Sequence, residues 1–249
     1  MELQNEPNDL DAFRRSIEAG DARTVRSLLA NSTSLRSRIN DPLFAFGGRA
    51  VQAASKHPKV IDVLLDFGAD INLRSDWPNG PFSILDSAPE EAARYYIARG
   101  AILTAHAAAR LGWINELRAV LDANPFVVHE KGGDGQRPLH FARTTVIADL
   151  LLDRGAEIDA RCVDHHSTAA QYALAERPEI CRHLIAQGAT PDIFIAARLG
   201  DNGLATRLIE AGADVHAAAN KYGTSMIDQA GDNEEVKKLL RELGAKPHE

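Results

Sequence analysis

The sequence predicts an all-α protein, built as a helical solenoid of about eight helix pairs with short β-hairpin loops. Three observations lead to this prediction. A short motif of two aliphatic residues, two variable residues and Gly-Ala recurs along the 249 residues. Each copy follows apolar residues at helical spacing, as in Val25, Leu28 and Leu29. The first and last copies are rich in charged residues, which the exposed ends of a stack of repeats require.

The recurrent motif marks the end of the second helix of each repeat. One copy reads Leu64-Leu65-Asp66-Phe67-Gly68-Ala69, and its glycine can end the helix in the left-handed conformation. The copies that carry this glycine end at Gly68, Gly100, Gly155, Gly188, Gly212 and Gly244. Two further copies carry Ser32 and Asn124 at this position. Because Asn tolerates the left-handed conformation, we expect Asn124 to replace glycine there, and Ser32 to do so less well.

The first helix of the repeat has its own pattern. Residues 134–142 read Asp-Gly-Gln-Arg-Pro-Leu-His-Phe-Ala, and the segments around His106 and Phe194 repeat the small-residue helix that follows. Together with the ending motif, these residues resemble the ankyrin repeat over nearly the whole chain, from about Asp9 to Ala245. The resemblance implies helix pairs stacked in a row, with hairpin loops between successive pairs. No single pair can bury its own apolar face, so stability must come from stacking on neighbours.

Those loops, called fingers below, are expected at residues 72–81, 129–136, 160–166 and 217–223. The eight ending positions are separated by 36, 32, 24, 31, 33, 24 and 32 residues. The two short intervals predict two missing fingers, with helices starting almost directly at Thr104 and after Thr190-Pro191-Asp192. The single domain of residues 1–249 then divides into repeat blocks 9–101, 102–190 and 191–246. The gaps are either neutral deletions or notches in the concave face that serve a function.

Composition excludes several function classes. The net charge of −7 and the absence of a basic run longer than two disfavour nucleic-acid binding. No apolar stretch approaches the roughly 18 residues of a membrane span, and the acidic, polar start does not resemble a signal peptide. Two cysteines are too few for a secreted disulfide framework, so we expect a reducing, cytoplasmic location. Arg greatly outnumbers Lys, which is typical of a bacterial source with a GC-rich genome.

Few residues suggest chemistry. His165 and His166 lie beside Asp164 and near Cys162. A zinc site needs about four convergent ligands. These residues are therefore interpreted either as solvated residues of a finger or as a metal or acid–base site. The resemblance gives His106 and His140 a structural hydrogen-bonding role at a helix start. Cys181 is expected to be a buried small hydrophobe. It cannot pair with His183, because residues two apart on a helix point to different sides. We expect no cofactor and no metal.

The predicted function is non-catalytic binding of another protein by a monomeric scaffold, through fingers and inner helices on the concave face. Trp77 either contacts the partner or packs locally, and the arginines either grip an acidic partner segment or form a solvated ionic face. The expected contact residues are Arg74, Asp76, Trp77, Arg110, Lys131, Arg161, Asp164, His165, His166, Arg198 and Tyr222. The alternative is an enzyme or small-ligand-binding protein with a pocket at a missing-finger notch near His106, His140 and His165. Tight neutralisation of one partner protein is a variant of the scaffold function.

Overall fold

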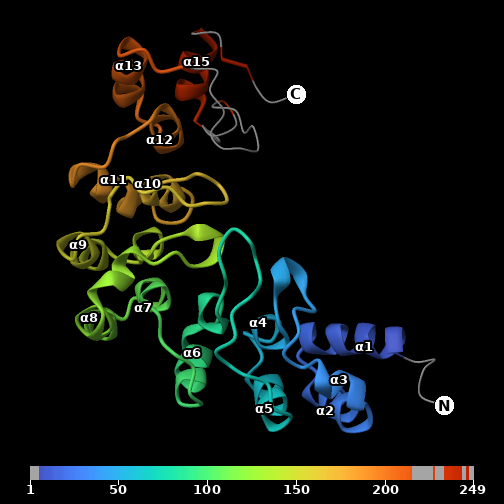
Figure 1. The fold of residues 1–249 in the computed structure, drawn as a ribbon. Helices are drawn as coiled ribbons and strands as arrows, with labels where there is room; N and C mark the ends of the chain where they lie inside the picture. The colour runs from blue at the N-terminus through green and yellow to red at the C-terminus, as the bar shows by residue number, and fades with distance from the viewer. Residues whose placement is uncertain (1–5, 215–226, 228–232, 243–244, 247–249) are drawn as a thin grey trace. The chain divides into compact units, whose positions relative to one another are not determined.

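The computed structural model describes residues 6–214, 227, 233–242 and 245–246 (Figure 1). Over these residues the fold is all-α, with fourteen α-helices, five short 3-10 helices and no strand beyond an isolated bridge between Phe44 and Gly48. None of the helices in this described part is both long and apolar enough to cross a membrane. The chain divides into two compact units, Met1–Leu111 with Gly132–Gly135, and Gly112–Lys131 with Gln136–Glu249.

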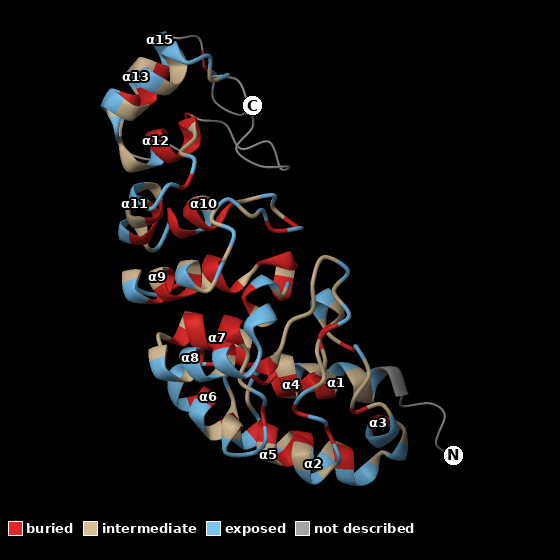
Figure 2. Cartoon of the chain, turned by 60° about the vertical axis from the view of Figure 1, so that its left-hand side comes forward, coloured by how far each residue is buried: buried red, intermediate tan, exposed pale blue. Residues whose placement is uncertain are grey.

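The first unit is a set of helices packed in chain order. Helix α1 packs on α2 and α4, α2 packs on α5, and α5 packs on α6. Phe13, Ile61 and Tyr96 on these helices are fully buried. Figure 2 shows in red the buried stretches of the helices. The elements are α1 (Glu6–Glu18), α2 (Ala22–Asn31), α3 (Thr33–Ser37), η1 (Ala45–Gly47), α4 (Ala50–Ala53), α5 (Pro58–Asp66), η2 (Ile84–Asp86), α6 (Glu90–Ile97), α7 (Ala105–Leu111) and η4 (Gly133–Gly135).

The second unit repeats this arrangement. Its longer helices contact one another in succession, α8 with α9 and α9 with α11, while α10 packs on α11 and α12 packs on α13. The short inner helices are rich in buried alanine, including Ala169, Ala170, Ala196 and Ala197, which allows close approach. The elements are α8 (Ile114–Ala123), η3 (Pro125–His129), η5 (Pro138–Phe141), α9 (Thr145–Asp153), α10 (Ala169–Ala173), α11 (Pro178–Ala186), α12 (Ile193–Leu199), α13 (Asn202–Glu210) and α15 (Glu234–Glu242).

The predicted glycine endings of the helices are confirmed wherever the structure describes them. The glycines at positions 68, 100, 155, 188 and 212 all have left-handed φ angles between 89° and 103°. In each copy the alanine that follows donates its N–H back to the end of the helix, as from Ala69 to Leu64 O at 2.9 Å. These bonds satisfy carbonyls that the helix would otherwise leave unpaired. Gly244 lies outside the described residues.

The prediction that Asn124 replaces glycine is wrong, and Ser32 departs in the same way. Both residues are extended, with φ −149° for Asn124 and −122° for Ser32. Each begins a further short helix instead. Ser32 Oγ accepts from Leu35 N–H at 3.2 Å to cap α3, and Asn124 Oδ1 accepts from Phe126 N–H at 3.1 Å to cap η3. A side chain with an acceptor oxygen satisfies a helix N-terminus, which glycine cannot do.

The fingers are present, but the prediction that they are β-hairpins is wrong for the described ones. Residues 72–81 contain no strand, although Ser75 N–H donates to Phe82 O at 2.9 Å across the loop. In the next block Cys162 N–H donates to Ser167 O at 3.0 Å in the same way. Pro78 and Pro81 supply no N–H for a longer ladder in the first of these loops. The finger at 217–223 lies outside the described residues.

Both predicted short connections are confirmed. Helix α7 begins at Ala105, four residues after Ala101, and Thr104 Oγ1 accepts from Ala107 N–H at 3.1 Å. Helix α12 begins at Ile193, and Asp192 Oδ1 accepts from Ile195 N–H at 2.9 Å. In both places a polar side chain starts the inner helix without an intervening finger.

Candidate functional site

The first unit contains a cavity of about 410 Å³ with aromatic walls. Its wall residues come from the end of α1, the turn that contains η1, helix α4 and the loop that leads into η2. Three phenylalanines and two carboxylates are among them. The wall residues are Glu18, Phe44, Ala45, Phe46, Gly48, Gln52, Ala53, Ser75, Phe82, Ser83, Asp86 and Ser87. We call this cavity the aromatic hollow.

Phe46 is the most unusual residue of the aromatic hollow. It has a left-handed backbone, with φ +56° and ψ +32°, which a bulky side chain rarely adopts. The tight turn that imposes it is held by Phe44 N–H, which donates to Gly48 O at 2.9 Å. The Phe46 side chain is nevertheless 61% exposed. Strain of this kind persists where the surrounding structure enforces it, and it is frequent at binding sites.

Trp77 lies beside the aromatic hollow and has partners within its own unit. Its ring meets the Phe46 ring edge to face, with centroids 5.0 Å apart and planes at 90°. Its indole Nε1–H donates to Asp134 Oδ1 at 2.9 Å. Local packing of Trp77 is therefore observed, while contact with a partner protein stays a prediction.

The segment Gly132–Gly135 packs against Phe82 and against His106 of α7. A Cβ atom on Gly133 would lie 2.1 Å from the Phe82 ring, and one on Gly132 would lie 2.9 Å from the His106 ring. Glycine is needed at both positions because the backbone packs directly on these side chains. The crevice beside His106 is too narrow to hold a molecule the size of water. The ligand pocket expected near His106, His140 and His165 stays a prediction.

Two of the arginines expected to grip a partner hold the protein's own backbone. Arg110 Nη2 donates to Leu85 O at 2.8 Å and to Ala88 O at 2.6 Å, which satisfies carbonyls at the end of η2. Arg161 Nη1 donates to His166 O at 2.6 Å across its own finger. Both guanidinium groups therefore donate hydrogen bonds to loops of the protein itself, and these donors are not available to a partner.

The remaining predicted contact residues are scattered. Arg74 is half-buried and lines the closed crevice beside His106, and Asp76 is exposed but paired with Arg49 at 2.9 Å. Lys131 and Arg198 are exposed. Tyr222 lies outside the described residues.

His140 has the structural role that the resemblance implies. Its Nδ1 accepts from Arg137 N–H at 3.2 Å, so its Nε2 carries the proton and donates to Ser167 O at 3.1 Å. Gln52 and Gln171 make equivalent hydrogen bonds elsewhere in the chain. The side-chain oxygen of each accepts from the backbone N–H three residues earlier at 2.8 Å. The side-chain amide of each donates to a later loop, at Leu73 O and Asp192 Oδ2 respectively. Because both ring nitrogens of His140 are used, neither is available for a metal or for proton transfer.

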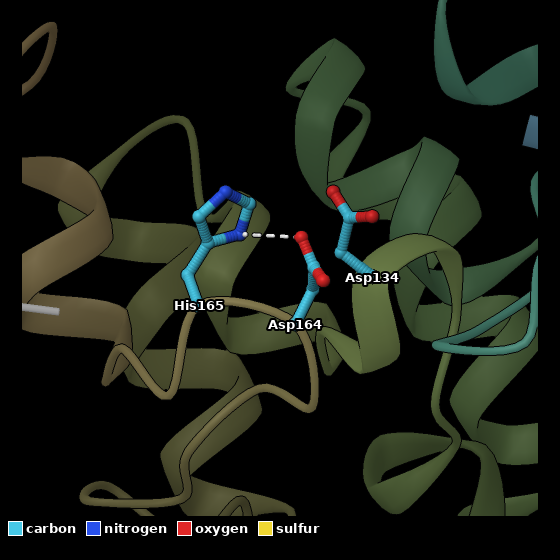
Figure 3. A group of neighbouring side chains, drawn as sticks. All are labelled: Asp134, Asp164 and His165. Carbon is cyan, nitrogen blue, oxygen red and sulfur yellow. Dashed lines mark ion pairs between the residues drawn. The ribbon is translucent and has the colours of Figure 1, made fainter. Parts of the chain in front are cut away.

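Asp164 and His165 form an ion pair in the second unit. His165 Nδ1 lies 3.4 Å from Asp164 Oδ2 (Figure 3). Asp164 is only 6% exposed, and the adjacent His166 has a left-handed φ of +55°. Within the described part of their own unit, these two residues find no third metal-ligating side chain. Cys162 is buried as a free thiol.

Cys181 is the buried small hydrophobe that was predicted. It is fully buried in α11, and desolvation raises the pKa of its thiol to about 11. The thiol is therefore neutral near pH 7 and a poor nucleophile. His183 is engaged elsewhere, because its Nε2 lies 2.6 Å from Asp149 Oδ1 on α9.

A second cavity, of about 470 Å³, lies in the second unit between α11 and the turn that joins α12 to α13. Arg182 and Arg207 line it together with Asp201 and Asn202. Asp201 is committed to helix capping, since its Oδ1 accepts from Leu204 N–H at 2.8 Å. The cavity is polar and combines charges of both signs.

Sequence reasoning missed the aromatic hollow. Its signal in the sequence is the run Phe44-Ala45-Phe46-Gly47-Gly48. This run lies where the first block would carry a finger. It places two aromatic residues next to a pair of glycines, which favour a tight turn. Comparison with models of known protein families finds none that matches this chain.

Proposed function

We propose that this protein is an ankyrin-type repeat scaffold that binds a partner protein without catalysing a reaction. Three features support a repeat stack: the successive contacts of the longer helices within each unit, the common Gly-Ala helix endings, and the shared capping role of Gln52, His140 and Gln171. Such a preformed surface binds without first having to be ordered. Monomeric state and cytoplasmic location belong to the same proposal.

The observation that carries the proposal is the exposed, strained Phe46 at the aromatic hollow. Aromatic side chains are favoured anchors of protein interfaces because they offer a large, rigid contact area. Phe44 and Phe82 line the same cavity, whose volume of about 410 Å³ is sufficient for large side chains of a partner. We therefore place the main contact at the aromatic hollow.

The enzyme alternative has weaker support. Its candidate groups are used in the fold: both nitrogens of His140 bond to the backbone, and the Cys181 thiol is buried with a raised pKa. The crevice beside His106 is too narrow to hold a substrate.

The test is a comparison of two exposed phenylalanines. Phe46 lines the aromatic hollow, whereas Phe126, which is 83% exposed in η3, does not. The tagged full-length protein, Phe46→Ser and Phe126→Ser are each used to capture proteins from native lysate. We expect a stoichiometric partner that Phe126→Ser retains and Phe46→Ser loses, with unchanged circular dichroism. A partner retained equally by both variants would refute this placement of the binding site.

A further inference from the structure

We infer that the aromatic hollow receives the side chain of an arginine or lysine from an extended segment of the partner. This inference deepens the proposed function and rests on it. The partner segment inferred here is basic. One of the two interpretations of the arginines in the sequence was that they bind an acidic partner segment.

The charge of the wall residues is the first argument. Glu18 and Asp86 both line the aromatic hollow, and no Lys, Arg or His is among the described residues that do so. Arg49 lies nearby in the sequence, but its guanidinium is paired with the Asp76 carboxylate at 2.9 Å and also donates to Asn40 O at 2.9 Å. The whole chain carries a net charge of −7, so its field also attracts cations.

The aromatic walls are the second argument. Arg and Lys have long apolar stems that pack on apolar surface while the charged end reaches a polar partner. Phe44, Phe46 and Phe82 offer such a surface, and a cation over an aromatic face gains further electrostatic attraction. A purely apolar side chain would leave the two carboxylates without a cation to balance their negative charge. An acidic side chain would be repelled by them.

The third argument concerns the shape of the occupant. In an extended segment, alternate side chains point to the same face. With a basic side chain in the aromatic hollow, the residues two positions before and after it in the segment therefore face the exposed Phe46 ring and the adjoining Trp77. Because Phe46 is already held in its turn, the binding surface needs little rearrangement.

The experiment uses random dodecapeptides displayed on phage, selected on the full-length protein. Phe46→Ser serves as the counter-selection target, so that only peptides depending on the aromatic hollow are enriched. We expect the enriched peptides to share one Arg or Lys at a fixed position, with apolar residues two positions away from it. Affinity of a labelled consensus peptide is then measured by fluorescence anisotropy, and replacement of its basic residue by Met should weaken binding.

The carboxylates are tested with the double variant Glu18→Gln, Asp86→Asn. The asparagine keeps an oxygen that can accept the Ser83 N–H now bonded to Asp86, so the fold is preserved. We expect a fivefold to tenfold loss of affinity, roughly the value of two exposed charge pairs, and a flatter salt dependence. The variant Glu176→Gln, Glu179→Gln, on exposed residues of the second unit, is the matched control and should bind as the wild type does.

Each outcome separates the two proposals. An apolar or acidic consensus that still depends on Phe46 would overturn the inference and leave the proposed function standing. A basic consensus whose affinity is unchanged by the double variant would also overturn it. No enrichment over the counter-selection would contradict the proposed function as well.

Discussion

The side chain of Asn72 binds both ends of the turn that follows α6, where Gly100 and Ile102 lie. Its Nδ2 donates to Gly100 O at 2.9 Å and its Oδ1 accepts from Ile102 N–H at 2.8 Å. Asn40 makes the same pair of bonds to the turn after α5, with Gly68 O and Asp70 N–H. In these two places one amide side chain thus joins the loop after one helix to the turn after the next long helix.

Loss of this link should destabilise the first unit. We expect Asn72→Ala to lower the free energy of unfolding by about 1–2 kcal/mol, because two hydrogen bonds between repeats are lost. Asn72→Asp should have a smaller effect, since it keeps the acceptor for Ile102 N–H and loses only the donor to Gly100 O. Urea denaturation followed by circular dichroism measures both. Asn115→Ala, at an exposed position of α8, is the control and should change stability by less than about 0.5 kcal/mol.

The role of His140 can be tested by substitution with the residue that other repeats use. Gln52 and Gln171 accept and donate at the equivalent position, so His140→Gln should keep most of the stability. His140→Ala leaves the Arg137 N–H without its acceptor and removes one of the two hydrogen bonds to Ser167 O, and should cost about 1–3 kcal/mol. Thermal unfolding compares the variants. If His140→Gln folds normally but abolishes the biological activity, the enzyme alternative gains over the scaffold.

Adjacent leucines of α9 differ in burial and should differ in their contribution. Leu151 is fully buried and Leu152 is only half-buried. We expect Leu151→Ala to cost about 2–5 kcal/mol through the cavity it leaves, and Leu152→Ala to cost clearly less. Equilibrium denaturation of the two variants gives the comparison. Equal losses would show that the packing of this helix differs from the one described.

The buried thiol of Cys181 should make stability sensitive to high pH. Burial raises its pKa from 9.0 to about 11, so the folded protein disfavours the thiolate. This contribution to stability is fully present below pH 9 and is lost as the pH rises from 9 towards 11. Melting temperatures of the wild type and Cys181→Ala, measured from pH 7 to 11, should therefore differ in slope, with the wild type falling faster above pH 9. Parallel curves would contradict the assigned burial of the thiol.

Features that depend on residues close together in the chain could be predicted from the sequence. Glycine at positions 68, 100, 155, 188 and 212 ends a helix in the left-handed conformation, because that preference is a property of the residue itself. The spacing between these endings showed where helices follow one another without a finger, at Ala105 and Ile193. The burial of Cys181 was implied by the ankyrin resemblance, which places this residue at a core position.

Only the tertiary structure decided the features that depend on residues far apart in the chain. Glu18, Phe46 and Phe82 meet around one cavity, although 28 and 36 residues separate them in sequence. The arginine at position 110 is bound to carbonyls more than 20 residues away, so its apparent availability in the sequence was misleading. Backbone preference acts over a few residues, whereas cavity shape and the pairing of charges depend on which distant segments pack together.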